Sequence, residues 1–313
     1  MNAETVIGRI VSVSALSLAL ACGGERAAAP ADGGASAPES QSSKPVTIKG
    51  SDTMVVLGQR LAEEYMKANP SAVIQVNGGG SGTGIAALIN GTADLAQSSR
   101  SMKSDELEKA KQSRGAEIVE TPVALDALAV FVHSVNPVKS LTIQQIAGIY
   151  GGKTKNWKDV GGSNAPIIIY GRESSSGTYD YFREHVLNKG DFVPTVQTLQ
   201  GTAAIINAVS RDKNGIGYGG IAYAKEVRAI GIKGDKGVVE PSIGTVADGS
   251  YPLSRKLFFY YPSNAPERVT QFVQWSLGPE AQALVTDVGY FPLATTASTA
   301  TATTTGGTAT QTQ

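Results

Sequence analysis

Four segments rich in glycine and hydroxyl side chains stand where predicted strands give way to predicted helices. They are 50–54 (GSDTM), 78–84 (GGGSGTG), 172–178 (RESSSGT) and 201–202 (GT). The first backbone N–H groups of a helix have no internal partner, and the helix dipole is positive there. An oxyanion at such a position accepts these hydrogen bonds without requiring a net positive charge on the protein.

The side chains of these segments add donors to those of the backbone. Glycine allows close approach of a ligand to the chain, and Ser and Thr hydroxyls rotate to suit it. Arg172 is suited to a two-pronged, charge-assisted bond to two oxygens of one anion. A single such loop is more often an ordinary helix cap, because Ser and Thr are preferred at that position. Four on one chain, one of them with an arginine, predict a tetrahedral-anion site with several donors.

The elements that position these loops follow from the alternation of short β-rich runs with amphipathic segments. Strands preceding the loops at 50, 78 and 172 are expected at 46–49, 73–76 and 167–170. The helices expected after the four loops are Val55–Ala68, 85–90, 179–186 and 203–210. Strands that alternate with helices predict parallel pairing and an α/β fold.

Two long apolar runs, 123–132 and 256–261, are predicted to be strands near the crossings between two lobes. The first lobe is then discontinuous and contains 46–124 plus 255–293, while 125–254 form the second. Both have the size of an ordinary domain. Each lobe is expected to hold a mixed, mostly parallel sheet flanked by helices.

Both ends of the chain differ in composition from the middle. An apolar run ends at Cys22, too short to span a bilayer but typical of a signal-peptide core. We expect a signal peptide over 1–21, a flexible tether over 22–45, and a disordered Thr/Ala-rich tail over 294–313. The run resembles a bacterial lipoprotein signal, in which Cys22 is lipidated. The alternative is a signal peptide that is cleaved elsewhere, with Cys22 incidental.

Composition excludes several classes of function. Lys+Arg and Asp+Glu both number 27, so the chain lacks the basic excess of a nucleic-acid-binding protein. One cysteine excludes a disulfide within the chain, and two histidines without zinc-ligand spacing predict no metal and no cofactor. A phosphatase or serine hydrolase would need a nucleophile activated by a base or a metal, and no such arrangement is visible.

Several segments together resemble the PstS family, the phosphate-binding proteins of bacterial phosphate ABC transporters. The resemblance spans about 46–293 and is carried by 50–54, 80–84, 93–100 (ADLAQSSR), 141–159 and 172–178. It implies a two-lobed periplasmic-binding-protein fold of type II that closes on inorganic phosphate in the cleft between the lobes. It also implies a monomer without enzymatic activity, held at a membrane by its lipid in the periplasm or at the cell surface. The implied partners are the permease and ATPase subunits of the importer.

Carried over position by position, the resemblance implies phosphate-binding residues in the segments 50–54, 78–84 and 172–178 and at positions 99 and 100. These are Ser51, Thr53, Met54, Ser81, Gly82, Thr83, Ser99, Arg100, Arg172, Ser176, Gly177 and Thr178.

The sequence departs from the PstS pattern where the family places an aspartate that accepts a proton from phosphate. Ser99 stands there, which leaves sulfate or molybdate open as alternative ligands. Asp52 or Glu173 could replace the acceptor, or each could instead cap a helix or pair with an arginine. Arg100 has two interpretations, as a second cationic ligand or as a residue that bridges the lobes.

Overall fold

The computed structural model describes residues 44–293. The predicted signal peptide, Cys22, nearly all of the tether and the Thr/Ala-rich tail lie outside them. The strands are β1 (Val46–Gly50), β2 (Ile74–Asn77), β3 (Leu95–Ser98), β4 (Ile118–Val132), β5 (Ser140–Leu141), β6 (Ile168–Arg172), β7 (Gln197–Leu199), β8 (Gly215–Gly220), β9 (Arg228–Gly234), β10 (Gly237–Val239) and β11 (Ser254–Pro262). The α-helices are α1 (Val55–Ala68), α2 (Ser81–Ile89), α3 (Ser104–Arg114), α4 (Ile143–Tyr150), α5 (Gly177–His185), α6 (Thr202–Arg211), α7 (Ile243–Ala247), α8 (Glu267–Ser276) and α9 (Pro279–Val288).

The strands form one mixed sheet in the order β2-β1-β3-β11-β4-β8-β6-β7, with β9, β10 and β5 off this path. At one end β1 is parallel to β2 and β3, and at the other β6 is parallel to β7 and β8. In the middle, β11 and β4 pair antiparallel with each other and with their outer neighbours β3 and β8. The prediction of a mixed α/β fold is confirmed. Because parallel strands end at the same edge, the loops after β1, β2 and β3 are brought together.

The long strand β4 contributes to two separate hydrophobic cores. One core contains Leu57, Leu61, Phe259 and Phe272, and the other contains Trp157, Phe182 and Tyr218. Along β4, Val123 and Ala124 belong to the first core, whereas Ala127 and Leu128 belong to the second. The apolar run 123–132 is part of a strand as predicted, and it is apolar at every position except Asp126 because both of its faces are covered.

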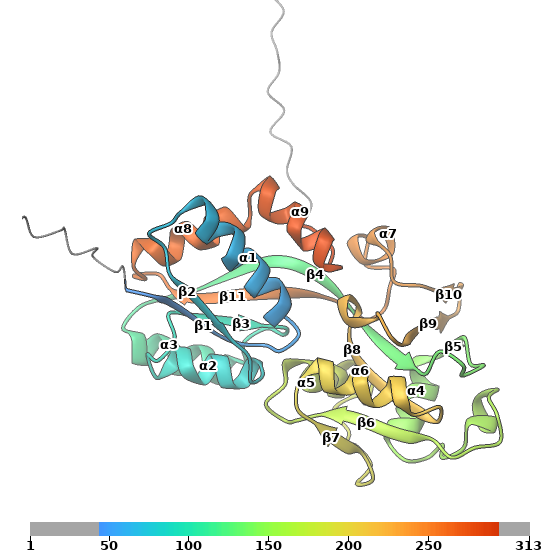
Figure 1. Cartoon of the computed structure of the whole chain (residues 1–313). Helices are drawn as coiled ribbons and strands as arrows, with labels where there is room; N and C mark the ends of the chain where they lie inside the picture. The colour runs from blue at the N-terminus through green and yellow to red at the C-terminus, as the bar shows by residue number, and fades with distance from the viewer. Residues whose placement is uncertain (1–43, 294–313) are drawn as a thin grey trace, which may run out of the picture. The chain divides into compact units, whose positions relative to one another are not determined.

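Helices cover both faces of the sheet around β1. The helices α1, α8 and α9 lie on one side of it, and α2 and α3 lie on the other (Figure 1). Buried Leu57, Leu61 and Tyr65 recur at helical spacing and form the inner face of α1. Among residues 44–293, none of the helices combines the length and the apolar character needed to cross a bilayer.

Helix α1 has the predicted bounds, Val55–Ala68, whereas α2, α5 and α6 begin earlier than predicted. The helix expected at 85–90 starts at Ser81, so part of the glycine loop forms the first turn of α2. This turn lies directly against β1, since a Cβ added at Gly84 would be 2.3 Å from the carbonyl oxygen of Lys49. The close approach of α2 to β1 therefore demands glycine inside the helix. Because glycines are typical of loops, the sequence 78–84 resembles a loop. In the same way α5 starts at Gly177, and Arg172 ends β6 instead of beginning a loop.

Candidate anion site

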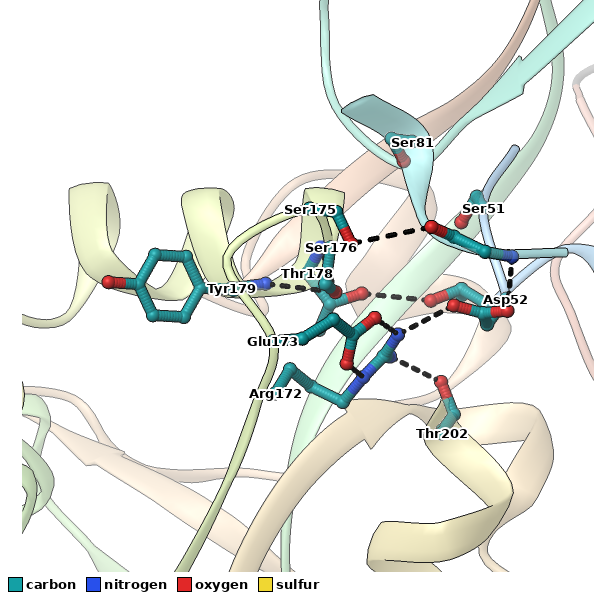
Figure 2. A network of polar contacts seen from close by, with 12 residues as sticks. Ser51, Asp52, Ser81, Arg172, Glu173, Ser175, Ser176, Thr178, Tyr179 and Thr202 are labelled. Atoms are coloured by element: carbon teal, nitrogen blue, oxygen red, sulfur yellow. Dashed lines mark hydrogen bonds and ion pairs between the residues drawn. The ribbon is translucent and has the colours of Figure 1, made fainter. Parts of the chain in front are cut away.

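The loops β1–α1, β2–α2 and β6–α5 meet in the structure. The hydroxyl oxygens of Thr53 and Thr178 are 2.8 Å apart and share a buried hydrogen bond. The N–H of Gly82 donates to the carbonyl oxygen of Ser175 at 2.9 Å. A Cβ at Gly80, whose φ is +92°, would lie 2.5 Å from that same oxygen. Segments more than ninety residues apart are thus in direct contact (Figure 2).

Arg172 is buried where these loops meet and is surrounded by acceptors. Its Nη2 is 2.9 Å from Oδ2 of Asp52, and both of its bonds to Glu173 are 3.0 Å or shorter. Its Nη1 donates to the hydroxyl of Thr202 at 2.8 Å (Figure 2). Two carboxylates therefore face one guanidinium, and the arginine brings no surplus positive charge to the site. An anion bound here must be held largely by neutral donors.

Such neutral donors come from the helix N-termini. Ser176 caps α5, and its Oγ accepts the N–H groups of Thr178 and Tyr179 at 3.2 and 3.3 Å. The serine hydroxyl keeps its own hydrogen to donate. Ser81 and Thr202 are the first residues of α2 and α6, and both are buried. The predicted placement of these hydroxyls at helix N-termini is confirmed.

Ser81 and Ser99 form a second hydroxyl pair beside α5. The N–H of Ser99 donates to Oγ of Ser81 at 3.1 Å, and the two hydroxyl oxygens are 3.4 Å apart. A Cβ at Gly177 would lie 2.3 Å from Oγ of Ser81 and 2.9 Å from Oγ of Ser99. Glycine at the start of α5 thus lets this helix approach both serines. Thr83 is partly buried in the first turn of α2.

The first loop uses two of its predicted donors for its own structure. The N–H of Met54 donates to the carbonyl oxygen of Ser51 at 3.0 Å, and the N–H of Ser51 donates to Gln97 at 2.8 Å. Ser51 and Met54 therefore shape the turn, and the hydroxyl of Thr53 is the group that meets the β6–α5 loop. Whether Ser51 and Met54 also contact the ligand stays a prediction.

Two tyrosines, the partly buried Tyr223 and the buried Tyr290, hold the backbone of this loop. The hydroxyl of Tyr223 donates to the carbonyl oxygen of Asp52 at 2.8 Å, and that of Tyr290 donates to the carbonyl oxygen of Thr53. Burial, followed by the negative charge of Asp52, raises the pKa of Tyr223 to about 12. The phenol consequently stays protonated and remains a donor at physiological pH.

A buried ion pair behind Thr178 was missed by the sequence reasoning. Asp126 of β4 and Arg255 of β11 lie directly opposite each other in the antiparallel register. Nε of Arg255 is 2.9 Å from Oδ2 of Asp126, and Nη2 donates to the hydroxyl of Thr178 at 3.1 Å. The available signal was a carboxylate inside the apolar run 123–132, because a buried charge requires a partner.

Comparison with known proteins agrees with this arrangement. A family described as the PBP superfamily domain matches residues 35–280. The phosphate-binding protein PstS of Pseudomonas aeruginosa is 40% identical over 264 residues, which are 78% of this chain and 81% of that protein. The chain belongs to the PstS family. The PstS of Staphylococcus epidermidis is 35% identical and covers 77% of each chain. A solved substrate-binding protein of a phosphate ABC transporter from Clostridium perfringens, with bound phosphate, has a TM-score of 0.73 at 32% identity, covering 80% of this chain and all of that one.

Arg100, predicted from the PstS pattern as a ligand or as a bridge, makes the bridging contact. Its Nη1 and Nη2 both bond to the carboxylate of Glu106 at 2.7 Å, and its Nε is 2.8 Å from Oδ2 of Asp180. Lys103 reaches the same oxygen of Asp180 at 3.0 Å. Arg100 thus joins the loop after β3 to helix α5, and a role as a phosphate ligand stays a prediction.

The two candidate replacements for the PstS acceptor aspartate both pair with an arginine. Oδ1 of Asp52 accepts the N–H of Gly79 at 2.8 Å, and Oδ2 faces Arg172. Both oxygens of Glu173 also bond to Arg172. The arginine-pairing alternative is what the structure shows, and a proton-accepting role for either carboxylate stays a prediction. In the described part of the chain, no cluster of side chains suits a metal ion.

Replacing Glu106 with Gln should reduce the free energy of unfolding by about 1–3 kcal/mol near neutral pH, because it weakens two bonds to a charged partner. Burial alone would raise the pKa of Glu106, but the bonds and charges of Arg100 and Lys103 lower it below its ordinary value of 4.5. A lowered pKa stabilises the fold above the unfolded pKa, and this contribution is lost as pH falls through the folded pKa. The difference between the two proteins should therefore shrink in acid.

Urea unfolding from about pH 7 to pH 3 measures this difference. The matched control is Glu108→Gln, which neutralises an exposed carboxylate of the same helix. If Glu106→Gln lowers the free energy of unfolding by the same amount over the whole pH range, the lowered pKa of Glu106 is contradicted.

Proposed function

We propose that this protein binds inorganic phosphate outside the cytoplasm and passes it to an ABC-type importer. The observation that carries the proposal is the meeting of four helix N-termini, rich in Ser, Thr and Gly, around buried Arg172 in a chain of the PstS family. Its partners are the permease and ATPase of the importer, and the protein acts as a monomer without chemistry of its own.

Phosphate is held between the loops by the hydroxyls of Thr53, Ser81, Ser176 and Thr178 and by backbone N–H groups, including that of Gly177. Arg172 orients the loops through its bonds to Thr202 and Asp52, and it offers its remaining N–H group to the phosphate. Gly82, Thr83 and Ser99 complete the surroundings at the start of α2. A micromolar Kd corresponds to about 8 kcal/mol, which several such bonds supply after the costs of association. Arg100 pairs with Glu106 and Asp180 and stays a predicted ligand.

Binding closes two lobes, 46–124 plus 255–293 and 125–254, over the anion. Three contacts between these segments support such closure: Thr53 with Thr178, Asp52 with Arg172, and Arg100 with Asp180. Each joins residues more than seventy positions apart, so they form only when the segments are together. A ligand that bonds to both sides favours the closed arrangement by its differential affinity.

Calorimetric titration of the purified protein, freed of carried-over anion by partial unfolding and dialysis, tests the function. One phosphate should bind per chain, and sulfate should bind far more weakly. Arg172→Met should weaken phosphate binding about a hundredfold, since removing one partner of a buried charged pair is costly. The matched control is Arg183→Met, which alters an arginine of α5 that is partly exposed.

Other results of these binding and hydrolysis measurements would favour a different ligand or an enzymatic function. Equal binding of sulfate or molybdate would replace phosphate with a broader class of oxyanion. Release of phosphate from a generic phosphate ester would favour a hydrolase. If no oxyanion binds at any pH between about 5 and 8.5, the proposal fails.

We also propose that Cys22 carries a lipid that anchors the exported protein to a membrane, as its position after the apolar run 10–21 indicates. Cys22→Ser should then move the protein from the membrane fraction to the soluble fraction and abolish labelling by a fatty acid. The control Ser17→Ala changes the same run without removing the thiol. Unchanged labelling of Cys22→Ser would refute the anchor.

A further inference from the structure

Asp126 and Arg255 form a buried ion pair that the proposed binding role does not yet use. Asp126 is fully buried, and the side chain of Arg255 is 2% exposed. Both Nε and Nη2 of Arg255 approach Oδ2 of Asp126, at 2.9 and 2.8 Å. The other carboxylate oxygen accepts the N–H of Ile221 at 3.3 Å. Apolar residues could fill such a position with similar stability, so a buried pair is better explained by what it orients.

What the pair orients is a line of two hydroxyl groups. Nη2 of Arg255 donates to Oγ1 of Thr178 at 3.1 Å, and Oγ1 of Thr178 is 2.8 Å from Oγ1 of Thr53. Arginine can only donate, whereas a hydroxyl accepts and also has one hydrogen to give. Hydrogen bonds that run in one direction polarise and strengthen each other. The favoured order is therefore Arg255 to Thr178 to Thr53, which leaves the hydrogen of Thr53 at the end of the line.

We infer that Asp126 and Arg255 are positioning residues that set the direction of the Thr178–Thr53 hydrogen bond, so that Thr53 presents its hydroxyl hydrogen to the bound phosphate. The inference rests on the proposed function, because it requires the anion to lie between these loops. Because Thr53 offers a hydrogen, it selects an ionised oxygen of the phosphate and turns any protonated oxygen toward another group.

The residues around Arg255 and Asp126 hold the ion pair in place. Its guanidinium carbon is 5.4 Å from the centre of the Tyr181 ring, and its Nη1 makes no hydrogen bond within the described part of the chain. A Cβ at Gly220 would lie 3.1 and 3.2 Å from the carboxylate oxygens of Asp126 and 3.0 Å from Cγ2 of Thr53. The carboxylate and Thr53 are thus packed against the same glycine, which leaves the pair little room to shift.

A double-mutant cycle on phosphate affinity tests the inference. Arg255→Met should weaken phosphate binding roughly tenfold to hundredfold, the range expected for one charge-assisted hydrogen bond. In a Thr178→Val background the same change should have little further effect, because the line of bonds is already broken. Arg268→Met is the control, since it removes an arginine that pairs with Asp94 at 3.3 Å outside these loops.

The outcomes separate this inference from the function on which it rests. If the unaltered protein does not bind phosphate, the proposed function fails and the inference fails with it. If it binds but the losses from Arg255→Met and Thr178→Val add in full, or if Arg255→Met has no effect, the inference alone is overturned. Thermal unfolding without phosphate checks the fold of each variant. Should Arg255→Met unfold, Arg255→Lys takes its place in the cycle, with a smaller expected loss that must again vanish beside Thr178→Val.

Discussion

The site depends on one electrostatic constraint: its buried arginine is already matched by carboxylates. Arg172 lies between Asp52 and Glu173, so it adds no surplus charge with which to attract an anion. The chain as a whole has a net charge of zero. An oxyanion must therefore be held by dipoles and neutral donors, which helix N-termini and hydroxyls supply. This explains why the loops are rich in Gly, Ser and Thr and poor in Lys.

Neutral donors are individually weak, so several must reach one point with correct directions. Parallel pairing of β1 with β2 and β3 brings three of the loops to one edge of the sheet, and β6 brings the loop of Arg172. The phenols of Tyr223 and Tyr290 fix carbonyl groups of the β1–α1 loop. Hydroxyls such as that of Thr53 can rotate, and a buried charge that orients them reduces the cost of ordering them when the ligand binds.

Local sequence patterns predicted the strands, helices and loops well, because the formation of these elements depends on residues that are neighbours in the chain. The strand at 123–132 and the hydroxyls at the helix starts were correctly predicted. The start of α2 was misplaced, since the glycines needed for its contact with β1 are typical of loops. Asp126 and Arg255 were missed because they are 129 positions apart and meet only through the register of β4 and β11. Pairing at such separation is set by tertiary structure, which a single sequence pattern does not contain.

The most direct test of the account is to locate the anion itself. Crystals of the protein grown with arsenate, a heavier tetrahedral analogue of phosphate, would give an anomalous signal at the arsenic atom. One strong peak is expected between the β1–α1, β2–α2 and β6–α5 loops, with anion oxygens about 3 Å from the hydroxyls of Thr53, Ser81 and Thr178. A peak elsewhere, for example among the basic side chains Arg183 of α5, Lys189 and Lys256, would contradict this placement of the anion.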